Sequence, residues 1–409
     1  MTRFLFVNQH YAPDVASTGQ HLADLAEWLV ARGHRVAVIT SSAGYEGGRV
    51  AAPRRERRNG VDVLRVRATA LGRGGTLARL VDYASFHLLA GARTLAGARR
   101  ADVVVTLTTP PLLGVWGEFA RRIGRVRHVA FLMDLHPDAE IALGMLDAES
   151  WVGRALRAAQ RWIVANADAG VVLGRHMAQR LVDDGVPRER LETIPIWSAG
   201  VNVEDANGVA ELRAERGWSE RFVAMYSGNA GHVHRFDEFL AAAERLEREA
   251  PHVLFAFVGG GPRRPELERR ARGRRNIEFR PYVPRAELAR SLAAADVHLV
   301  SLEAAAAGVS IPGKLIGILA AGRPVVFVGP RASEPFESVE ASGAGFALEP
   351  GGDVARALVA LARDPDECRR MGALGRAWFE RHHSEERACA DWTRLLERVA
   401  SGAAREVLA

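Results

Sequence analysis

The chain has 409 residues, too many for one ordinary hydrophobic core and suited to two domains of about 200 residues each. Its hydrophobic content of 48% and charged content of 25% are typical of globular proteins. The longest uncharged apolar stretch, residues 103–117, is too short and too broken by prolines to span a bilayer. The net charge is +6, but the basic residues are spread among acidic ones without interleaved aromatic residues, which argues against a nucleic-acid partner.

Short apolar runs alternate with amphipathic stretches in the first half, the pattern of a parallel sheet with helices on both faces. Only four apolar residues precede Asn8, so we interpret the N-terminus as a buried strand and not as a signal peptide. We expect strands at residues 4–8, 35–40, 61–65, 102–106, 128–133, 169–172 and 192–195. Helices are expected at residues 19–32, 76–97, 111–123, 150–166 and 175–184.

A second series of the same kind begins near residue 220. We expect strands at residues 222–226, 253–258, 277–279, 297–300, 324–328 and 345–348, and helices at residues 236–248, 264–272, 285–293, 314–321, 365–382 and 385–399. The two cysteines, Cys368 and Cys389, show no metal-ligand spacing and are interpreted as free thiols of a cytoplasmic protein.

The two series predict an α/β protein with two Rossmann-like, doubly wound domains that face each other across a cleft. The first domain is expected to span residues 1–198 and the second residues 209–382. The small polar segment 199–208 has no periodicity and is interpreted as the linker. Residues 383–409 are expected to form a C-terminal helix that returns to the N-terminal domain.

Two common ligand classes of Rossmann-like domains are disfavoured by the glycine pattern. A dinucleotide fingerprint requires three spaced glycines after a strand, but the first strand is followed only by Gly19, and the run Gly259–Gly261 is broken by Pro262 and Arg264. A Walker A phosphate loop is absent from the sequence. The chain is therefore expected to be neither a nicotinamide dehydrogenase nor an NTPase.

One turn after a predicted strand is rich in small residues, with the sequence Tyr226-Ser-Gly-Asn-Ala-Gly-His232. Its glycines let backbone N–H groups close on an oxyanion at the start of the following helix. The alternative is an ordinary strand-to-helix turn. In the first interpretation His232, His234 and Arg235 contact phosphate or sugar, and in the second they are solvated residues at a helix start.

Lys314 is the only lysine among 55 basic residues, and it follows Pro312 and Gly313 where a helix is expected to begin. A cation in a first helical turn is unfavourable unless an anion neutralises it. A compact ammonium also suits a tight phosphate pocket better than a planar guanidinium does. The alternative is that one lysine survived by chance, but its position predicts a ligand of phosphate groups.

Five segments together resemble the family 4 retaining glycosyltransferases, which have the GT-B fold. They are Asn8–Asp14, Leu25–Val36, Met133–Asp138, Tyr226–Gly231 and Ile311–Pro324. The resemblance covers nearly the whole chain and is closest to the branch that makes bacterial surface polysaccharide, including fucosamine-type transferases of colanic-acid-like pathways.

The resemblance implies a hexosyltransferase that takes a sugar from a nucleotide-sugar donor held by the second domain, and it favours UDP over GDP as the nucleotide. The acceptor would be a glycan, lipid-linked or small-molecule hydroxyl held by the first domain. It also implies that no metal or other cofactor is needed, since cations and helix N-termini take the charge of the leaving diphosphate. The donor phosphate would accept the proton of the acceptor, and the anomeric configuration would be retained.

The resemblance assigns residues to the donor as follows. The nucleotide base would lie over Tyr282 and Val283, and the phosphates would meet residues of both glycine-containing turns. The full set of donor-binding residues is Ser17, Thr18, Gly19, Gly228, Asn229, Gly231, His232, Arg235, Gly260, Tyr282, Val283, Glu303, Ser310, Pro312, Gly313 and Lys314. Of these, Ser17, Thr18 and Gly19 would close the cleft from the first domain.

Asp134 and His136 end the fifth predicted strand, at the sheet edge where a cleft is expected, and we assign them with Lys314 to the catalytic group. The structural alternatives are a helix N-cap for Asp134 and an ordinary loop position for His136. An exposed carboxylate is the alternative for Glu303. The two tryptophans Trp28 and Trp151 are interpreted as packing residues.

The chain departs from the family pattern at two positions of the second domain, and in the first domain Ala16-Ser17 replaces the usual Gly-Gly. Most members carry two glutamates eight positions apart, and here Val309 and Gly317 occupy those positions. The second glutamate normally contacts the ribose. The missing glutamates suggest a non-catalytic binding protein that kept the fold as one alternative function. A sugar-nucleotide epimerase or phosphorylase on the same fold is another. A glycoside hydrolase is disfavoured because no pair of carboxylates is placed for acid and nucleophile roles.

The basic excess also suits an anionic membrane surface. Two local clusters, residues 53–58 and 121–127, are rich in arginine, and the second follows an apolar segment. They predict a peripheral contact with the inner face of the membrane. The alternative is a solvated, arginine-rich face.

Overall fold

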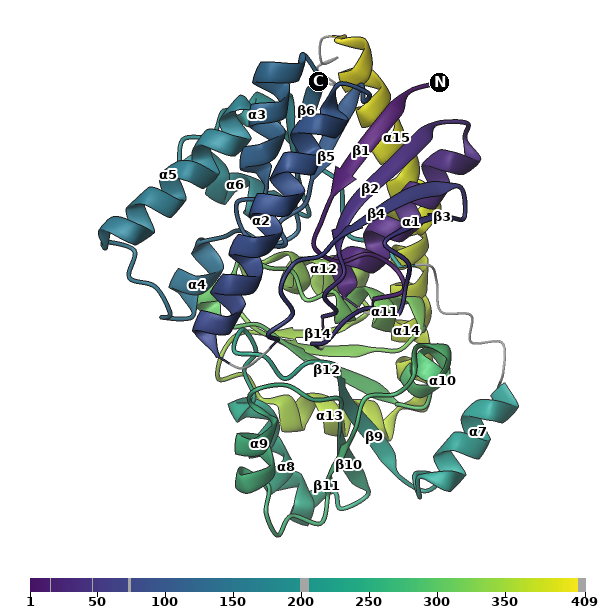
Figure 1. Cartoon of the computed structure of the whole chain (residues 1–409). Coiled ribbons are helices and arrows are strands. Elements are labelled where there is room, and N and C mark those ends of the chain that lie inside the picture. Colours follow the sequence, from purple (N-terminus) through teal and green to yellow (C-terminus); the bar gives the residue numbers. More distant parts are fainter. Residues whose placement is uncertain (15, 46, 73–74, 199–205, 404–409) are drawn as a thin grey trace. The chain divides into compact units, whose positions relative to one another are not determined.

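The computed structural model describes residues 1–14, 16–45, 47–72, 75–198 and 206–403 (Figure 1). The chain divides into two compact units, Met1–Pro195 with Glu386–Ala409, and Ile196–Glu385. The first unit thus ends before residue 198, and the second begins before residue 209. Of the predicted linker, residues 206–208 belong to helix α7 (Ala206–Glu215), and the remainder lies outside the described residues.

The first unit is built on an eight-stranded sheet in the order β3-β4-β2-β1-β5-β6-β7-β8. Its strands are β1 (Arg3–Val7), β2 (Arg35–Ser41), β3 (Arg55–Arg58), β4 (Val61–Val66), β5 (Val103–Thr106), β6 (Arg127–Leu132), β7 (Ala169–Val172) and β8 (Leu191–Thr193). All neighbours pair in parallel except β3 with β4. The seven predicted strands are present. Strand β3 was missed because its sequence, Arg-Glu-Arg-Arg, contains no apolar residue and forms a sheet edge.

The helices of the first unit are α1 (Ser17–Ala31), α2 (Thr76–Ala98), α3 (Gly114–Gly124), α4 (Asp138–Ala142), α5 (Trp151–Asn166), α6 (Arg175–Asp183) and α15 (Glu385–Ser401), with a 3₁₀ turn η1 (Arg188–Arg190). Helix α3 starts three residues later than predicted, after Leu112, whose φ is 61°. The short helix α4 was not predicted. None of the helices among the described residues is long and apolar enough to cross a membrane.

The C-terminal helix α15 packs on the first sheet, although it is far from that sheet in sequence. The ring of Trp392 lies 4.6 Å from the ring of Phe131 in β6, centroid to centroid. The indole Nε1 of Trp28 in α1 donates a hydrogen bond of 3.3 Å to Thr393 Oγ1. The chain therefore returns to its first unit, as the sequence predicted, and Trp28 is a packing residue. The second tryptophan interpreted in this way, Trp151 at the start of α5, is 77% exposed, so that interpretation was wrong.

A buried polar network ties α3 to the sheet. His128 in β6 and Glu118 in α3 are both fully buried, and His128 Nδ1 lies 2.8 Å from Glu118 Oε1. The second ring nitrogen of His128 lies 2.9 Å from Thr106 Oγ1. Burial alone would raise the pKa of Glu118, but hydrogen bonds from His128 and Arg121 outweigh it and lower that pKa.

The second unit is built on six parallel strands in the order β11-β10-β9-β12-β13-β14. They are β9 (Phe222–Ser227), β10 (Val253–Val258), β11 (Ile277–Arg280), β12 (Val297–Ser301), β13 (Val325–Val328) and β14 (Gly345–Leu348). Every predicted strand of this series is present, and apolar clusters pack on the sheet around Phe236 and around Trp218. This doubly wound arrangement brings the loops after β9, β10 and β12 to one sheet edge.

The helices of the second unit are α7, α8 (Asp237–Glu249), α9 (Arg264–Arg270), α10 (Leu288–Ala293), α11 (Lys314–Ala320), α12 (Glu334–Ser342), α13 (Val354–Arg363) and α14 (Pro365–His382), with 3₁₀ turns η2 (Arg285–Glu287) and η3 (Ala304–Ala306). Helices α7, α12 and α13 were not predicted. Helix α13 did carry a signal, since Asp353 caps it by accepting a hydrogen bond of 2.9 Å from the backbone N–H of Arg356.

We predict that Glu118→Gln destabilises the protein by about 3–5 kcal/mol at neutral pH, because it leaves a buried ionic network broken on one side. Since the pKa of Glu118 is lowered in the fold, its stabilisation is present above its ordinary pKa of 4.5 and is lost as the pH falls through the folded value. Urea unfolding of both proteins at several pH values should show the difference shrinking below pH 4.5. An unchanged difference across that range would contradict the ionic role.

Candidate functional site

Two glycine-containing turns cross at the carboxyl edge of the second sheet. Residues 227–231 follow β9, and residues 259–261 follow the neighbouring strand β10. Gly259 has a φ of 135°, and a Cβ there would lie 2.2 Å from the carbonyl oxygen of Gly228. Gly261 has a φ of 123°, and a Cβ there would lie 2.6 Å from the backbone nitrogen of Ala230. Glycine is therefore required at both positions by conformation and by space.

Some backbone N–H groups of the first turn are used by the protein itself. Gly228 N–H donates to the carbonyl of Val258 at 2.8 Å, and Ala230 N–H donates to that of Gly260 at 2.7 Å. The N–H groups of these two residues are therefore already used within the protein. The N–H groups of Asn229 and Gly231 find no acceptor in the described part of the chain, so they can bind an anion.

Lys314, the first residue of α11, reaches across to this turn. Its Nζ donates a hydrogen bond to the hydroxyl of Tyr226, lies 3.4 Å from the carbonyl oxygen of Asn229, and lies 3.8 Å from the centroid of the Tyr226 ring. The Tyr226 hydroxyl in turn donates to the Asn229 carbonyl at 2.9 Å. The structure therefore brings Gly228, Asn229 and Lys314 together, as the sequence predicted.

The ammonium of Lys314 has no acidic partner among the described residues, and its side chain is half-buried. Desolvation lowers its pKa well below the ordinary value of 10.5. Its position in the first turn of α11 adds the unfavourable helix dipole. An anion bound beside the turn would relieve both penalties.

Two other basic residues near the turn, His234 and Arg235, are neutral and paired, respectively. His234 is buried, its Nδ1 donates to the carbonyl of Ser301 at 2.6 Å, and burial together with the charge of Lys314 lowers its pKa to about 3. Arg235 lies between two carboxylates, with Nη2 2.7 Å from Glu238 Oε1 and Nη1 3.1 Å from Glu303 Oε2. The predicted donor contacts Arg235 and Glu303 therefore pair with each other in this structure.

The ring of Tyr282, two residues after β11, lies against the second glycine turn. It is 58% exposed, and a Cβ at Gly260 would lie 2.9 Å from its Cε2. An exposed aromatic ring held against a glycine is suited to stacking on a flat ligand. Val283 beside it packs against the apolar cluster around Trp218.

The remaining predicted donor residues are spread along the same edge. His232 is exposed, Pro312 is buried, Gly313 is exposed, and Ser310 is half-buried. The N–H groups of Gly313 and Lys314 donate to no acceptor among the described residues.

The catalytic candidates of the first unit lie after β6. His136 Nδ1 lies 2.8 Å from Glu140 Oε1 of α4. Burial alone would lower the pKa of His136, but the hydrogen bond and charge of Glu140, with the charges of Asp134 and Asp138, outweigh it and raise that pKa. The structure thus provides a partly accessible histidine that is oriented by Glu140 and whose pKa the neighbouring carboxylates raise.

The start of α1 lies against the loop after β1. Thr18 Oγ1 accepts a hydrogen bond of 3.3 Å from Asn8 Nδ2. A Cβ at Gly19 would lie 2.9 Å from the carbonyl carbon of His10. Gly19 therefore permits close packing of the helix on this loop, and Ser17 and Thr18 occupy its first turn.

Sequence reasoning did not assign Tyr226 or Glu140 to the site. Tyr226 is the first residue of the turn that the sequence indicated. Its contact with Lys314 joins residues 88 positions apart, so no local pattern predicts it. Glu140 follows His136 by four positions, the spacing of neighbouring side chains on one helix face. That spacing was a usable signal, although α4 itself was not predicted.

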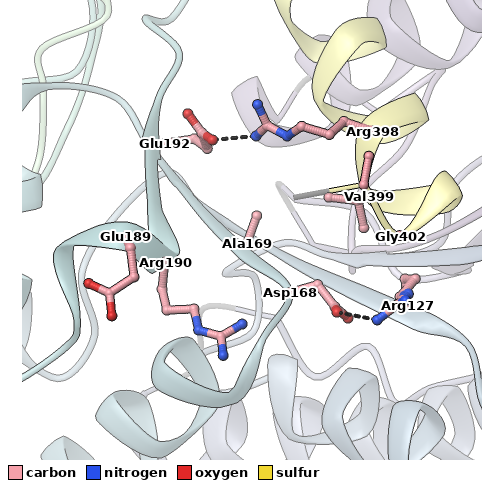
Figure 2. Close-up of a pocket in the computed structure, with 10 residues that line it drawn as sticks. Arg127, Asp168, Ala169, Glu189, Arg190, Glu192, Arg398, Val399 and Gly402 are labelled. Atoms are coloured by element: carbon pink, nitrogen blue, oxygen red, sulfur yellow. Dashed lines mark hydrogen bonds and ion pairs between the residues drawn. The ribbon is translucent and has the colours of Figure 1, made fainter. Parts of the chain in front are cut away.

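A hollow of about 190 Å³ lies at the other edge of the first sheet (Figure 2). Its charged side chains are largely paired: Arg127 Nη1 lies 3.0 Å from Asp168 Oδ1, and Arg398 donates to Glu192. It lies at the amino ends of β6, β7 and β8, away from the edge where ligands of doubly wound sheets bind. We therefore do not assign it to the functional site.

Two family models match the chain in succession. Residues 18–197 match a glycosyl transferase 4-like domain. Residues 221–364 match the glycosyl transferases group 1. The chain is a two-domain glycosyltransferase of the GT-B fold.

Relatives and solved structures agree with this assignment. The glycosyltransferase is similar to the Escherichia coli colanic acid biosynthesis glycosyl transferase WcaI, with 29% identity over 94% of this chain and 97% of the relative. It is also 29% identical to a GDP-mannose-dependent α-(1-6)-phosphatidylinositol monomannoside mannosyltransferase of Mycolicibacterium smegmatis, over 65% of this chain and 69% of the relative. The crystal structure of Anabaena HepE in complex with UDP-glucose matches with a TM-score of 0.73 and 15% identity, covering 97% of this chain and 100% of HepE.

We predict that Glu140→Gln lowers the pKa of His136, because the substitution removes the carboxylate that holds its proton. The titration of the His136 ring, followed by NMR, should have its midpoint above 6.5 in the natural protein and at a lower pH in the variant. A raised histidine pKa stabilises the fold below pH 6.5, and this contribution is lost as the pH rises through the folded value. The exposed carboxylate Glu149 provides a control, since Glu149→Gln should leave the midpoint unchanged. Equal midpoints in all three proteins would contradict the pairing.

Proposed function

We propose that the glycosyltransferase moves a sugar from a UDP-linked donor to a hydroxyl acceptor without a metal ion, retaining the anomeric configuration. The observation that carries the proposal is the unpaired, desolvated ammonium of Lys314 beside the glycine turn. A diphosphate is the anion that such a site suits, because it brings several charged oxygens to one ammonium and to nearby backbone N–H groups.

Lys314 acts in this proposal as the counter-charge of the leaving diphosphate. The N–H groups of Asn229, Gly231 and Gly313 supply further hydrogen bonds. An anion beside Lys314 raises its lowered pKa again, so the ammonium is fully charged when the donor is bound. As the bond between the anomeric carbon and the phosphate oxygen breaks, the charge that develops on that oxygen is stabilised by a cation already in place.

The nucleotide is proposed to lie along the second glycine turn. The exposed ring of Tyr282 offers a stacking surface for the base, beside Gly260. UDP is favoured by the similarity to the HepE complex with UDP-glucose. The mannosyltransferase relative is GDP-mannose-dependent by name, so an experiment must first test the identity of the nucleotide base. Ribose contacts are not provided by residues 309 and 317, since these are Val309 and Gly317.

The acceptor is proposed to bind the first unit near Asp134 and His136. The acceptor oxygen bonds to the anomeric carbon on the face that the diphosphate leaves, and its proton passes to the departing phosphate oxygen. His136, whose pKa Glu140 raises, supports charge near the reacting centre, and Asp134 binds sugar hydroxyls. We propose a glycan, lipid-linked or small-molecule acceptor, as in surface polysaccharide synthesis, and a cytoplasmic enzyme in peripheral contact with the membrane.

We predict that a UDP-sugar raises the thermal unfolding temperature of the protein, because ligand that binds only the folded state stabilises it. A screen should compare UDP-, GDP-, dTDP- and ADP-sugars, each with and without EDTA. Protection that survives EDTA supports metal-independent binding. No protection by any nucleotide sugar would overturn the proposed function. Nucleotide release that does not depend on an added acceptor would favour an epimerase or phosphorylase instead.

We predict that Lys314→Arg loses most sugar transfer while the fold survives. The longer, planar guanidinium does not fit the position of Nζ over the Tyr226 ring, 3.8 Å from its centroid. Misplacing one charge-stabilising group costs on the order of 10²–10³ in kcat. The reverse conservative exchange at an exposed site of the same unit, Arg331→Lys, is the matched control. Near-natural kcat in Lys314→Arg, with circular dichroism unchanged in both variants, would contradict the role of Lys314.

A further inference from the structure

His234 is a buried histidine of the second unit that lies between β9 and α8. It is 6% exposed, and its backbone N–H donates to the carbonyl of Gly231 at 3.3 Å. Its ring lies 5.9 Å from the ring of Tyr226, centroid to centroid, at an angle of 78°. A Cβ at Gly231 would lie 4.0 Å from its Cδ2. The imidazole therefore packs beside the same turn that Lys314 reaches.

The surroundings of the ring fix where its hydrogen lies. Nδ1 lies 2.6 Å from the carbonyl oxygen of Ser301, which can only accept, so Nδ1 carries the hydrogen. Burial, together with the positive charges of Lys314 and Arg263, lowers the pKa of His234 to about 3. A neutral imidazole with its hydrogen on Nδ1 has a lone pair on Nε2. Nε2 of His234 is therefore a hydrogen-bond acceptor at neutral pH.

This acceptor is unused within the protein. Nε2 has no hydrogen-bond partner in the described part of the chain, and it is not enclosed by protein. Cδ2, the ring carbon bonded to Nε2, faces Gly231, so this edge of the ring is turned toward the candidate phosphate site. A neutral imidazole can also bind a metal ion, but the described residues contain no group of three His, Cys, Asp or Glu side chains that could hold one. A hydrogen-bond donor is the group that fits Nε2.

The groups proposed to hold the diphosphate all donate hydrogen bonds. The ammonium of Lys314 and the N–H groups of Asn229 and Gly231 suit the oxygens of a diphosphate. At neutral pH a diphosphate ester has no hydrogen to give in return, so it cannot satisfy Nε2. A nucleotide sugar carries such hydrogens on both sides of its diphosphate, as hydroxyls of the ribose and of the transferred sugar. A hydroxyl is therefore the donor that this ligand class supplies.

The second domain also lacks carboxylates that would otherwise accept from a hydroxyl. Val309 and Gly317 stand where most family members have glutamates, and Glu303 is bound by Arg235 at 3.1 Å. We infer that Nε2 of His234 accepts a hydrogen bond from a hydroxyl of the bound nucleotide sugar. This inference rests on the proposed function and deepens it, because it adds a specificity-determining residue to the donor site.

Two substitutions separate the roles of the two ring nitrogens. The side-chain amide of His234→Asn ends near the position of Nδ1, so it can still donate to Ser301, but it places nothing at the position of Nε2. The amide of His234→Gln is one bond longer and can place its carbonyl oxygen near that position. His252→Asn, the same exchange at an exposed histidine of the same unit, is the matched control. Circular dichroism and thermal unfolding show whether each variant is folded.

The test compares dissociation constants of the full chain, measured by isothermal titration calorimetry, for inorganic pyrophosphate, UDP and UDP-glucose, with GDP and GDP-mannose in parallel. We expect His234→Asn to weaken nucleotide-sugar binding about two- to tenfold, because one hydrogen bond is lost. Pyrophosphate binding should not change, because pyrophosphate has no carbon-bound hydroxyl. His234→Gln should show a smaller loss with the same selectivity, and His252→Asn should bind every ligand like the natural protein.

The ligand series also identifies the hydroxyl. An equal loss for the nucleoside diphosphate and the nucleotide sugar assigns His234 to the ribose. A loss confined to the nucleotide sugar assigns it to the transferred sugar. If His234→Asn does not fold, the same comparison is made with His234→Gln.

Two results would overturn the inference alone. One is unchanged nucleotide-sugar binding in the folded variant. The other is an equal loss for pyrophosphate, which would show that His234 shapes the phosphate site and does not contact a hydroxyl. If the natural protein binds no nucleotide and no nucleotide sugar, the proposed function itself fails, and the inference fails with it.

Discussion

The candidate donor site depends on one unpaired charge. Lys314 is held against the ring and hydroxyl of Tyr226 and near the carbonyl of Asn229, all of which stabilise an ammonium only partly. A buried or half-buried cation without a counter-ion costs free energy in the unliganded protein. An anion bound beside Lys314 would recover that cost, and the proposed function therefore makes a ligand, and not a side chain, the complement of this charge.

The surroundings of Lys314 preserve this condition. Arg235 is engaged by Glu238 and Glu303, and His234 is neutral because its pKa is lowered to about 3. Neither supplies a second free cation that would share the anion. The crossing of the glycine turns is equally specific, since a Cβ at Gly259 or Gly261 would collide with the first turn. The glycines therefore set the shape of the candidate anion site, and a single lysine supplies its charge.

Much of this arrangement was predictable from local sequence, and some of it was not. The strands were found because buried parallel strands are short continuous apolar runs, whereas β3 lacks apolar residues and was missed. The glycine turn and Lys314 were recognised from glycine content and helix-start chemistry. The pairing of Arg235 with Glu303 joins residues 68 positions apart, and no local pattern indicates it. Local sequence does not predict the exposure of an apolar side chain either. Leu77 and Leu88 of α2 have the spacing of a core face, yet they are 75% and 70% exposed.

Gly317 connects the missing family glutamate to the unpaired lysine. It lies three residues after Lys314 in α11, the spacing at which side chains of a helix interact. Packing does not require glycine there, because a Cβ would lie 3.5 Å from Leu292 Cδ1, an ordinary contact. A glutamate at this position would stand within reach of the ammonium and compete with a diphosphate for it. With glycine in its place, no carboxylate at position 317 competes for Lys314, and under the proposed function the side chain stays available to the donor diphosphate.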